Sequence, residues 1–244
     1  MSLLEILENK NLKIKFSGMD YLDNCLNKQH FKNYNKTIFY EYNSQGFRDK
    51  EWPDDLKNQI WCIGDSFTVG LGQPQKEIWP QILEQRVGER CINISEDGCS
   101  NDLMSLRIEQ IKNNFNPKCI VVMWSYFWRR WIDNKNVHFG KDQRELPKDD
   151  LNNFLKNLQS ANSNSPCSIL NYVIPDCMIE SSISWKRVLG IKNKKNINKL
   201  INYHYPGNQF PIVNEVEQID YARDGHHFDI LTCEKIVEHI LTKY

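Results

Sequence analysis

The sequence contains no long hydrophobic run, no excess of charge and no closely paired cysteines, and each absence excludes a class of protein. No stretch of the 244 residues approaches the roughly 18–20 consecutive apolar residues that a membrane-spanning helix needs. The first residues include an acid, Glu5, and no apolar run long enough for the core of a signal peptide. We therefore expect a soluble, cytoplasmic protein that does not bind a membrane.

The charges of the chain balance, with 31 basic and 31 acidic side chains. A general nucleic-acid-binding protein needs a surplus of lysine and arginine, so we expect no nucleic-acid partner. Hydrophobic residues make up 40% of the chain, enough to bury a core, which excludes a disordered tail. The composition does not indicate an oligomeric state.

The eight cysteines form no C-x-x-C pair. Four of them lie in or beside apolar runs that are typical of strands: Cys62, Cys91, Cys119 and Cys167. Cysteine is among the most frequently buried residue types, so buried free thiols explain this distribution better than disulfides or a zinc site.

Apolar runs and helical patterns alternate after residue 58, which predicts a parallel sheet with crossover helices. Residues 1–58 are polar and irregular, with a candidate strand at Thr37–Tyr42, and we expect them to be an N-terminal extension of an α/β domain spanning 59–244. A polar loop with Gly140 and Pro147 is expected before the third helix. The expected strands are Ile60–Ile63, Cys91–Ile94, Cys119–Trp124 and Ser168–Ile174, and the expected helices are Ile78–Val87, Ser100–Phe115, Asp149–Gln159 and Leu231–Leu241.

A serine follows the first expected strand, in Gly64-Asp65-Ser66-Phe67. Ligands of open parallel sheets bind beyond the carboxyl ends of the strands, and a serine at this turn presents its hydroxyl there. Its N–H lies near a helix N-terminus, where it stabilises developing negative charge. These features suit a nucleophile for acyl transfer, although the tripeptide is also compatible with an ordinary turn and helix cap.

A second motif, Asp224-Gly225-His226-His227, precedes the last expected helix. A serine hydroxyl needs a base at neutral pH, imidazole is the usual one, and the base needs an orienting carboxylate. Asp224 and His227 lie three positions apart on a glycine-containing turn, so both can point into one cleft. His226 is the rival of His227, as an alternative base, a substrate contact or a spectator.

The pair Gly64-Asp65-Ser66-Phe67 and Asp224-x-x-His227 resembles the motifs of the GDSL/SGNH hydrolases, a family of esterases and lipases, over about Ile60–Tyr244. The segment Asn43-Ser-Gln-Gly46-Phe47-Arg48 also resembles segments before the first strand of some members. The resemblance implies an α/β fold: a three-layer α/β/α sandwich around a mostly parallel, flavodoxin-like sheet. It also implies a reaction that needs no metal and no organic cofactor.

Carried over to this chain, the resemblance implies Ser66 as the nucleophile, His227 as the general base and Asp224 as the residue that orients it. The family's oxyanion hole uses the N–H of the nucleophile and of a glycine after the second strand. Gly98 occupies that place, in Asn93-Ile-Ser-Glu-Asp-Gly98. Gly98 is equally compatible with a turn before a helix capped by Ser100.

The chain departs from the family after the third strand, where the family usually has G-x-N-D with the asparagine as a third oxyanion donor. The sequence here is Val121-Val-Met-Trp124-Ser125-Tyr126-Phe127-Trp128-Arg129-Arg130, without asparagine. Loss of one oxyanion donor typically lowers the rate by about 10²–10³ unless it is replaced. The candidates for the third donor are Ser125, Tyr126 and Asn101.

Aromatic and basic side chains crowd the end of this strand. Aromatic faces beside arginine suit a sugar ring or a flat acyl group, whereas core packing is the alternative explanation of such a cluster. The expected substrate contacts are Trp124, Tyr126, Trp128, Arg129, Arg130 and His226.

The expected function is that of a serine esterase acting on an acyl ester or a carbohydrate O-acetyl ester, through a Ser-His-Asp triad and an acyl-enzyme. Its partner is then a small-molecule or carbohydrate ester. Two alternatives stay open: an O-acyltransferase with the same triad, and a non-catalytic carbohydrate- or ligand-binding module, which the missing asparagine favours.

Overall fold

The computed structural model describes residues 12–138, 147–175 and 213–244. Their main sheet comprises the strands β3 (Ile60–Ile63), β4 (Cys91–Asn93), β5 (Cys119–Trp124), β8 (Ser168–Val173) and β9 (Val213–Glu215). These five strands are all parallel, in the order β4-β3-β5-β8-β9. Because the first strand lies between the second and the third, the order is that of flavodoxin.

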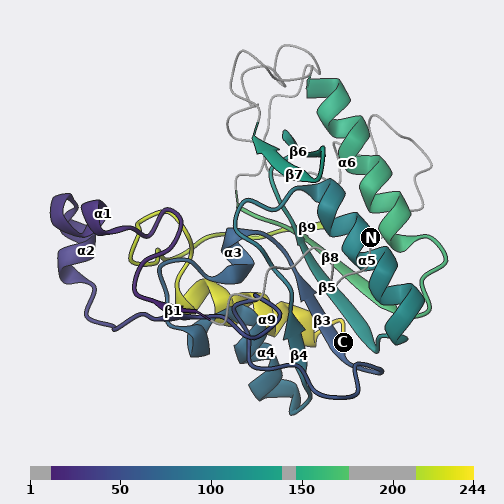
Figure 1. Ribbon diagram of the computed structural model, residues 1–244, viewed down its shortest axis with the longest axis horizontal. Helices are drawn as coiled ribbons and strands as arrows, with labels where there is room; N and C mark the ends of the chain where they lie inside the picture. The colour runs from purple at the N-terminus through teal and green to yellow at the C-terminus, as the bar shows by residue number, and fades with distance from the viewer. Residues whose placement is uncertain (1–11, 139–146, 176–212) are drawn as a thin grey trace.

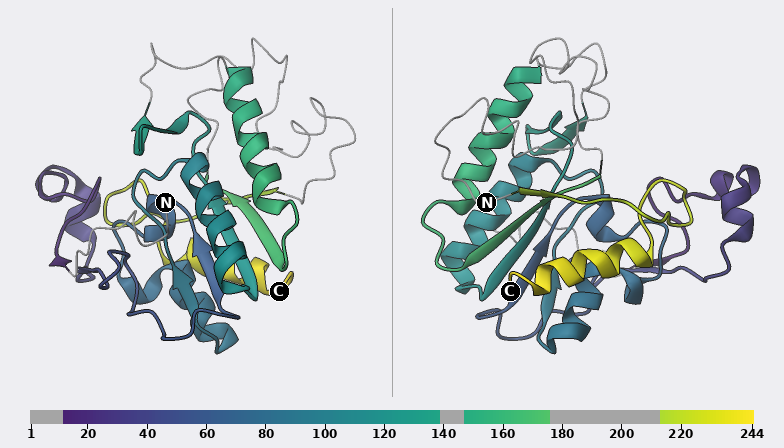
Figure 2. Two further views of the ribbon diagram at one scale, coloured as in Figure 1. Left: turned by 45° about the vertical axis from the view of Figure 1, so that its right-hand side comes forward. Right: turned by 180° about the vertical axis from the view of Figure 1, so that it is seen from behind.

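Helices of the described chain cover both faces of the sheet (Figures 1 and 2). On one face, α4 (Trp79–Val87) packs against α9 (Ile230–Leu241). On the other, α5 (Asn101–Phe115) packs against α6 (Pro147–Asn162), and the Oγ of Ser100 caps α5 by accepting the N–H of Leu103. The predicted three-layer α/β/α class is thereby confirmed.

The two central strands end at the same edge of the sheet. β3 and β5 are buried throughout and consist of continuous apolar residues, as expected for parallel strands covered on both faces. Ile63 pairs with Val122, so Ser66 and Ser125 follow their strands on the same side. The chain connections diverge between these strands, which is where ligands of doubly wound sheets bind.

The described part of the N-terminal segment contains β1 (Lys13–Ile14), α1 (Leu22–Asn27), α2 (Gln29–Asn33) and β2 (Tyr40–Glu41). β1 and β2 pair antiparallel, and β2 is shorter than the strand expected at Thr37–Tyr42. The buried guanidinium of Arg48 donates to the carbonyls of Phe39, Val69, Gly70 and Gln73, and so joins this segment to the loop after α3 (Ser66–Val69). The domain boundary at residue 58 stays a prediction.

A hairpin that was not predicted from the sequence precedes the expected polar loop, whose Gly140 lies outside the described residues. Its strands are β6 (Arg129–Ile132) and β7 (Lys135–His138), and its turn is Asp133-Asn134. Both turn residues have positive φ, 49° and 60°, a backbone conformation that Asp and Asn tolerate and that matches the twist of a two-residue hairpin. Charged and aromatic residues in both strands obscure the alternation that would reveal them.

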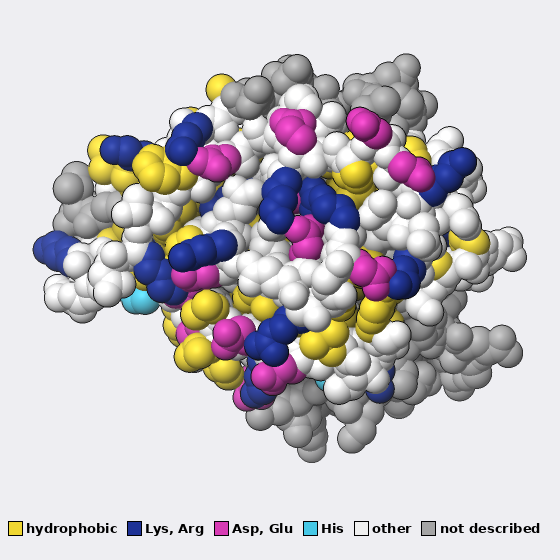
Figure 3. All heavy atoms as spheres, turned by 90° about the horizontal axis from the view of Figure 1, so that it is seen from below, with side chains coloured by type: hydrophobic (Ala, Val, Ile, Leu, Met, Phe, Trp, Pro, Cys, Tyr) yellow, Lys and Arg dark blue, Asp and Glu magenta, His cyan; other side chains and the backbone are white. Residues whose placement is uncertain are grey.

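The six cysteines whose side chains are described carry free thiols: Cys62, Cys91, Cys99, Cys119, Cys167 and Cys233. Cys25 and Cys177 lie outside the described side chains. Within the described ranges, no helix combines the length and apolar character needed to cross a bilayer. Figure 3 shows basic and acidic side chains interspersed on the face seen from below in Figure 1.

Candidate active site

Ser66 begins α3, immediately beyond the end of β3. Asp65 is the N-cap of this short helix, and its Oδ1 accepts the N–H of Phe67 at 3.1 Å. A side chain at Gly64 would collide with Thr68, so only glycine lets the helix turn back this tightly against the strand. This turn places Ser66, 3% exposed, at the edge where β3 and β5 end.

Ser66, His227 and Asp224 form a continuous chain of hydrogen bonds. The Nε2 of His227 lies 2.8 Å from the Oγ of Ser66, and its Nδ1 lies 2.5 Å from the Oδ2 of Asp224. The first distance falls in the range of about 2.6–3.2 Å for a nucleophile and its base. Two motifs 161 residues apart thus meet in one buried cluster.

The carboxylate of Asp224 is held by its own turn as well as by the imidazole. Its Oδ1 accepts the backbone N–H groups of His226 at 2.9 Å and of His227 at 3.0 Å. Burial raises the pKa of Asp224, but the His227 ring and these N–H groups outweigh burial and bring the pKa below its ordinary value. An ionised Asp224 keeps a proton on Nδ1 of His227, which leaves Nε2 to accept the proton of Ser66.

His226 lies beside this chain without joining it. Its ring is perpendicular to that of His227, with centroids 4.9 Å apart, and both rings pack against Phe67. Burial, followed by the charge of His227, lowers the pKa of His226. Of the two histidines, His227 is therefore the one placed to exchange a proton with Ser66.

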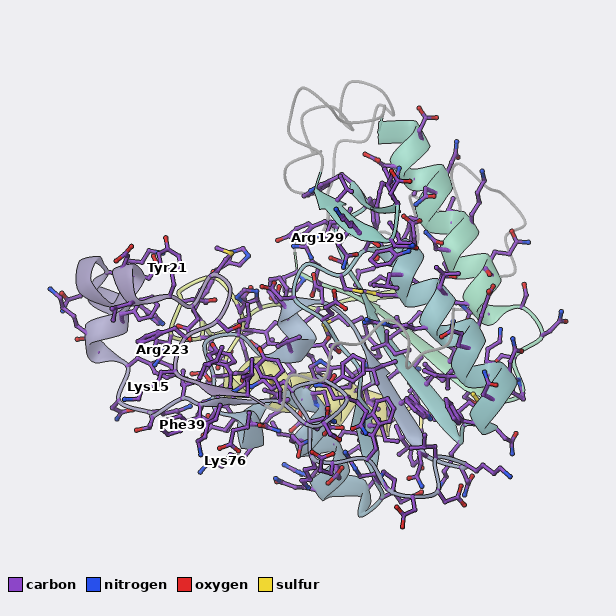
Figure 4. All side chains as sticks on the ribbon, viewed as in Figure 1. Lys15, Tyr21, Phe39, Lys76, Arg129 and Arg223 are labelled. Carbon is purple, nitrogen blue, oxygen red and sulfur yellow. The ribbon has the colours of Figure 1, made fainter. Side chains whose placement is uncertain are left out.

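An ion pair that the sequence does not reveal stands next to the serine. The Oδ2 of Asp65 accepts hydrogen bonds from Ser125 Oγ at 2.6 Å and from Arg129 Nη1 at 2.7 Å. Asp65 is fully buried, the Arg129 side chain is 11% exposed, and its buried Nε has no partner among the described residues. Figure 4 shows Arg129 between α3 and the β6–β7 hairpin. The sequence signal that could have indicated such a partner is Asp65 itself, because a carboxylate buried beside the serine needs a hydrogen-bond donor or a cation.

Ser66 and Gly98, the two residues whose N–H groups are expected in the oxyanion hole, are both buried. Their N–H groups donate to no other described residue, and Gly98 adopts a positive φ of 74°. Two expected third donors are engaged elsewhere, which corrects that expectation. The side chain of Asn101 donates to the carbonyls of Ser125 and Tyr126 and accepts the N–H of Ser125. The hydroxyl of Ser125 donates to the carboxylate of Asp65.

Two of the expected substrate contacts instead belong to the packing of α6. Trp124 is fully buried, its Nε1 donates to Asn171 at 3.0 Å, and its ring packs edge-on against Phe154. Arg130 is 5% exposed and forms an ion pair of 2.8 Å with Asp150. Both side chains contact α6, and no described contact joins either of them to the serine, so the expectation for them is corrected.

The other part of the aromatic cluster is connected through Arg129 to Asp65, the residue before the serine. The ring of Tyr126 stacks on Trp128, with centroids 4.6 Å apart, and the guanidinium of Arg129 lies over Tyr126 at 4.8 Å.

No group of three or more His, Cys, Asp or Glu side chains in the described ranges is arranged to hold a metal ion.

Searches for similar proteins found relatives only among solved structures, since no protein-family model and no curated protein matches the chain. A family two carbohydrate esterase from Clostridium thermocellum, in complex with cellohexaose, is 14% identical, with 80% of this chain and 65% of that chain covered and a TM-score of 0.46. A family 3 carbohydrate esterase from the same organism is 16% identical, with 77% and 94% covered and a TM-score of 0.41. A member of the lipolytic G-D-S-L family from Veillonella parvula is 15% identical, with 75% and 96% covered and a TM-score of 0.41.

The chain spans 65% of the length of the family two esterase. At these identities the similarity concerns the fold. What the site does chemically is argued below from its own geometry.

Proposed function

We propose that the chain is a serine esterase in which Ser66 attacks an ester carbonyl while His227 takes its proton. The proposal rests on the 2.8 Å contact between Ser66 Oγ and His227 Nε2. Collapse of the tetrahedral intermediate breaks the ester C–O bond, and the leaving alcohol receives the proton from His227. Water, deprotonated by the same imidazole, then releases the acid from Ser66. Asp224 stabilises the imidazolium in both steps.

The oxyanion is held by the N–H groups of Ser66 and Gly98 and by the positive charge of Arg129. Both N–H groups lack an acceptor among the described residues, which supports this assignment. The negative charge of Asp65 would by itself repel the oxyanion of the tetrahedral intermediate. The 2.7 Å ion pair with Arg129 neutralises the charge of Asp65. In this proposal Arg129 replaces the asparagine that the family has after the third strand.

The substrate class that we propose is an O-acyl ester of a carbohydrate, with a small acyl group such as acetyl. The stacked rings of Tyr126 and Trp128, joined to the site through Arg129, support a sugar ring as the alcohol part. A small acyl group suits a serine that is only 3% exposed.

The test compares p-nitrophenyl acetate hydrolysis by the chain with hydrolysis by Ser66→Ala. We expect a loss of about 10³-fold or more in kcat, because the nucleophile is removed. Ser105→Ala is the matched control, since Ser105 is a buried serine on α5 whose Oγ donates to Asn157 of α6. Equal rates for Ser66→Ala and the parent chain would exclude the serine mechanism. A fluorophosphonate that fails to label Ser66 in the folded protein would favour a binding module.

The same triad also supports acyl transfer to a sugar hydroxyl. Burial of the reacting groups favours this second candidate, because Ser66 and His227 are 3% and 1% exposed and a dry site disfavours water as the acceptor. Reactions with and without a sugar acceptor separate the two. Release of free acid alone, at the same rate in both, would reject transfer.

A further inference from the structure

The loop that carries the proposed base and its carboxylate is tied to the N-terminal segment, which has no part in the proposed chemistry. Residues 216–229 contain no helix or strand and pass beside residues 12–33 in each view of Figures 1 and 2. The Nε2 of His30 lies 2.6 Å from the carbonyl oxygen of Ala222. Because the loop lacks regular structure, its position depends on such contacts.

The main contact is a bidentate ion pair between Arg223, the residue before the triad carboxylate, and Asp20. The Nε of Arg223 donates to Oδ1 at 2.9 Å, and its Nη2 donates to Oδ2 at 2.6 Å. The guanidinium lies over the rings of Phe16 and Phe31, at 5.0 and 5.9 Å, and also donates to the carbonyl of Lys15 (Figure 4). Asp20 is fully buried and the Arg223 side chain 12% exposed, so the pair defines one geometry.

Tyr40 connects this ion pair to the loop after α3. Its hydroxyl donates to Asp20 Oδ2 at 2.5 Å and accepts the N–H of Gly72 at 2.8 Å. The N–H of Arg223 in turn donates to the carbonyl of Gly72 at 2.8 Å. A Cβ on Gly72 would lie 3.1 Å from the backbone nitrogens of Arg223 and Asp224, so the two loops are packed backbone to backbone. The N-terminal segment therefore holds the side chain of Arg223 through Asp20, whereas the loop after α3, joined to that segment by Tyr40, holds its main chain.

We propose that the Asp20–Arg223 pair is a positioning device, through which the N-terminal segment holds Asp224 and His227 in reach of Ser66. The inference rests on the proposed function. Asp224 follows Arg223 directly, so a shift of the Arg223 backbone moves the carboxylate that orients the imidazole. A displacement of about 1 Å at a reacting group costs roughly 10²-fold in rate.

The experiment uses the full chain and three variants: Asp20→Asn, Arg223→Met and the double variant. Glu41→Gln is the matched control, because it breaks an exposed ion pair between β1 and β2 in the same segment without touching the loop. Two quantities are measured: kcat and KM for p-nitrophenyl acetate, and amide hydrogen exchange at the two backbone N–H groups that donate to Asp224. The exchange rates report on the loop whether or not the chain is active.

We expect each single variant to lower kcat by about 10- to 100-fold while KM stays within about twofold, and to accelerate exchange at both amides. The double variant loses no more than either single variant, because all three remove the same pair. The control behaves as the parent chain does. Asp20→Asn keeps the size of the side chain and an acceptor for Tyr40, so it decides the question if Arg223→Met does not fold.

The proposal would be overturned if Asp20→Asn had the same kcat and the same amide exchange rates as the parent chain. It would also be overturned if the fold-losses of kcat in the two single variants multiplied in the double variant. If the parent chain is as inactive as Ser66→Ala, the proposed function fails. The exchange rates then still decide whether the Asp20–Arg223 pair orders the loop.

Discussion

The ion pair between Arg129 and Asp65 provides the sharpest test of the proposed oxyanion site. Arg129→Met keeps an apolar stem of similar length and removes the cation. Breaking a buried pair by removing one partner typically costs about 3–5 kcal/mol, because the remaining charge is left uncompensated. Asp65 keeps hydrogen bonds from Ser125 and the N–H of Phe67, at 2.6 and 3.1 Å. We therefore expect the free energy of unfolding to fall by about 2–3 kcal/mol.

The effect on catalysis is expected to be separate from the effect on stability. Removing one donor from an oxyanion site typically lowers kcat by about 10²–10³, or roughly 3–4 kcal/mol of transition-state stabilisation. We expect a loss of this size in Arg129→Met, measured with p-nitrophenyl acetate. KM should change little, because the interaction is made in the transition state.

The double variant Asp65→Asn/Arg129→Met separates the two effects. It removes both charges, and asparagine still caps α3 because it is among the preferred N-cap residues. We expect urea unfolding followed by circular dichroism to show stability within about 1 kcal/mol of the parent chain. The kcat stays as low as in Arg129→Met. If kcat recovers together with stability, Arg129 has a structural role only, and the proposed third oxyanion contact is refuted.

Three further predictions concern the triad and the segment before the sheet. Asp224→Asn should lower kcat by about 10⁴, because the imidazole loses its orienting carboxylate, and retention of more than a tenth of the activity would contradict the triad. The pKa of Asp224 is lowered on folding from its ordinary 3.8, so its contribution to stability is present above that value and lost as the pH falls through the folded pKa. The stability difference between the parent and Asp224→Asn should therefore shrink from about pH 6 to about pH 2, and a difference that is constant with pH in urea titrations would be inconsistent with this. Arg48→Met leaves buried carbonyls without their donor and should lower the free energy of unfolding by about 2–4 kcal/mol, whereas an unchanged midpoint in thermal unfolding would show that water replaces the guanidinium.

Much of the sheet could be predicted because its central strands are local features. Ile60–Ile63 and Cys119–Trp124 are continuous apolar runs, and both match the observed strands. The cap at Ser100 was equally local, since its Oγ serves an N–H three residues further on. Such patterns depend on neighbours in the sequence and are legible without the fold.

The surroundings of the serine could not be predicted in the same way. Trp124 and Trp128 are the same residue type, four positions apart. Trp124 packs against Phe154 of α6, whereas Trp128 stacks on Tyr126. The sequence contains no sign of which one points inward, because the direction depends on where the strand ends and the hairpin begins.

The sequence by itself determined the layered class of the fold and the strands at its centre, and it singled out the serine, histidine and aspartate that lie within hydrogen-bond distance of one another. Only the tertiary structure decided that Arg129 neutralises Asp65 and that Arg223 reaches back 203 residues to Asp20. The physical reason is that apolar periodicity records which faces are buried, and motifs record which groups can react. The pairing of a buried carboxylate with one particular guanidinium depends instead on how those faces pack together in space.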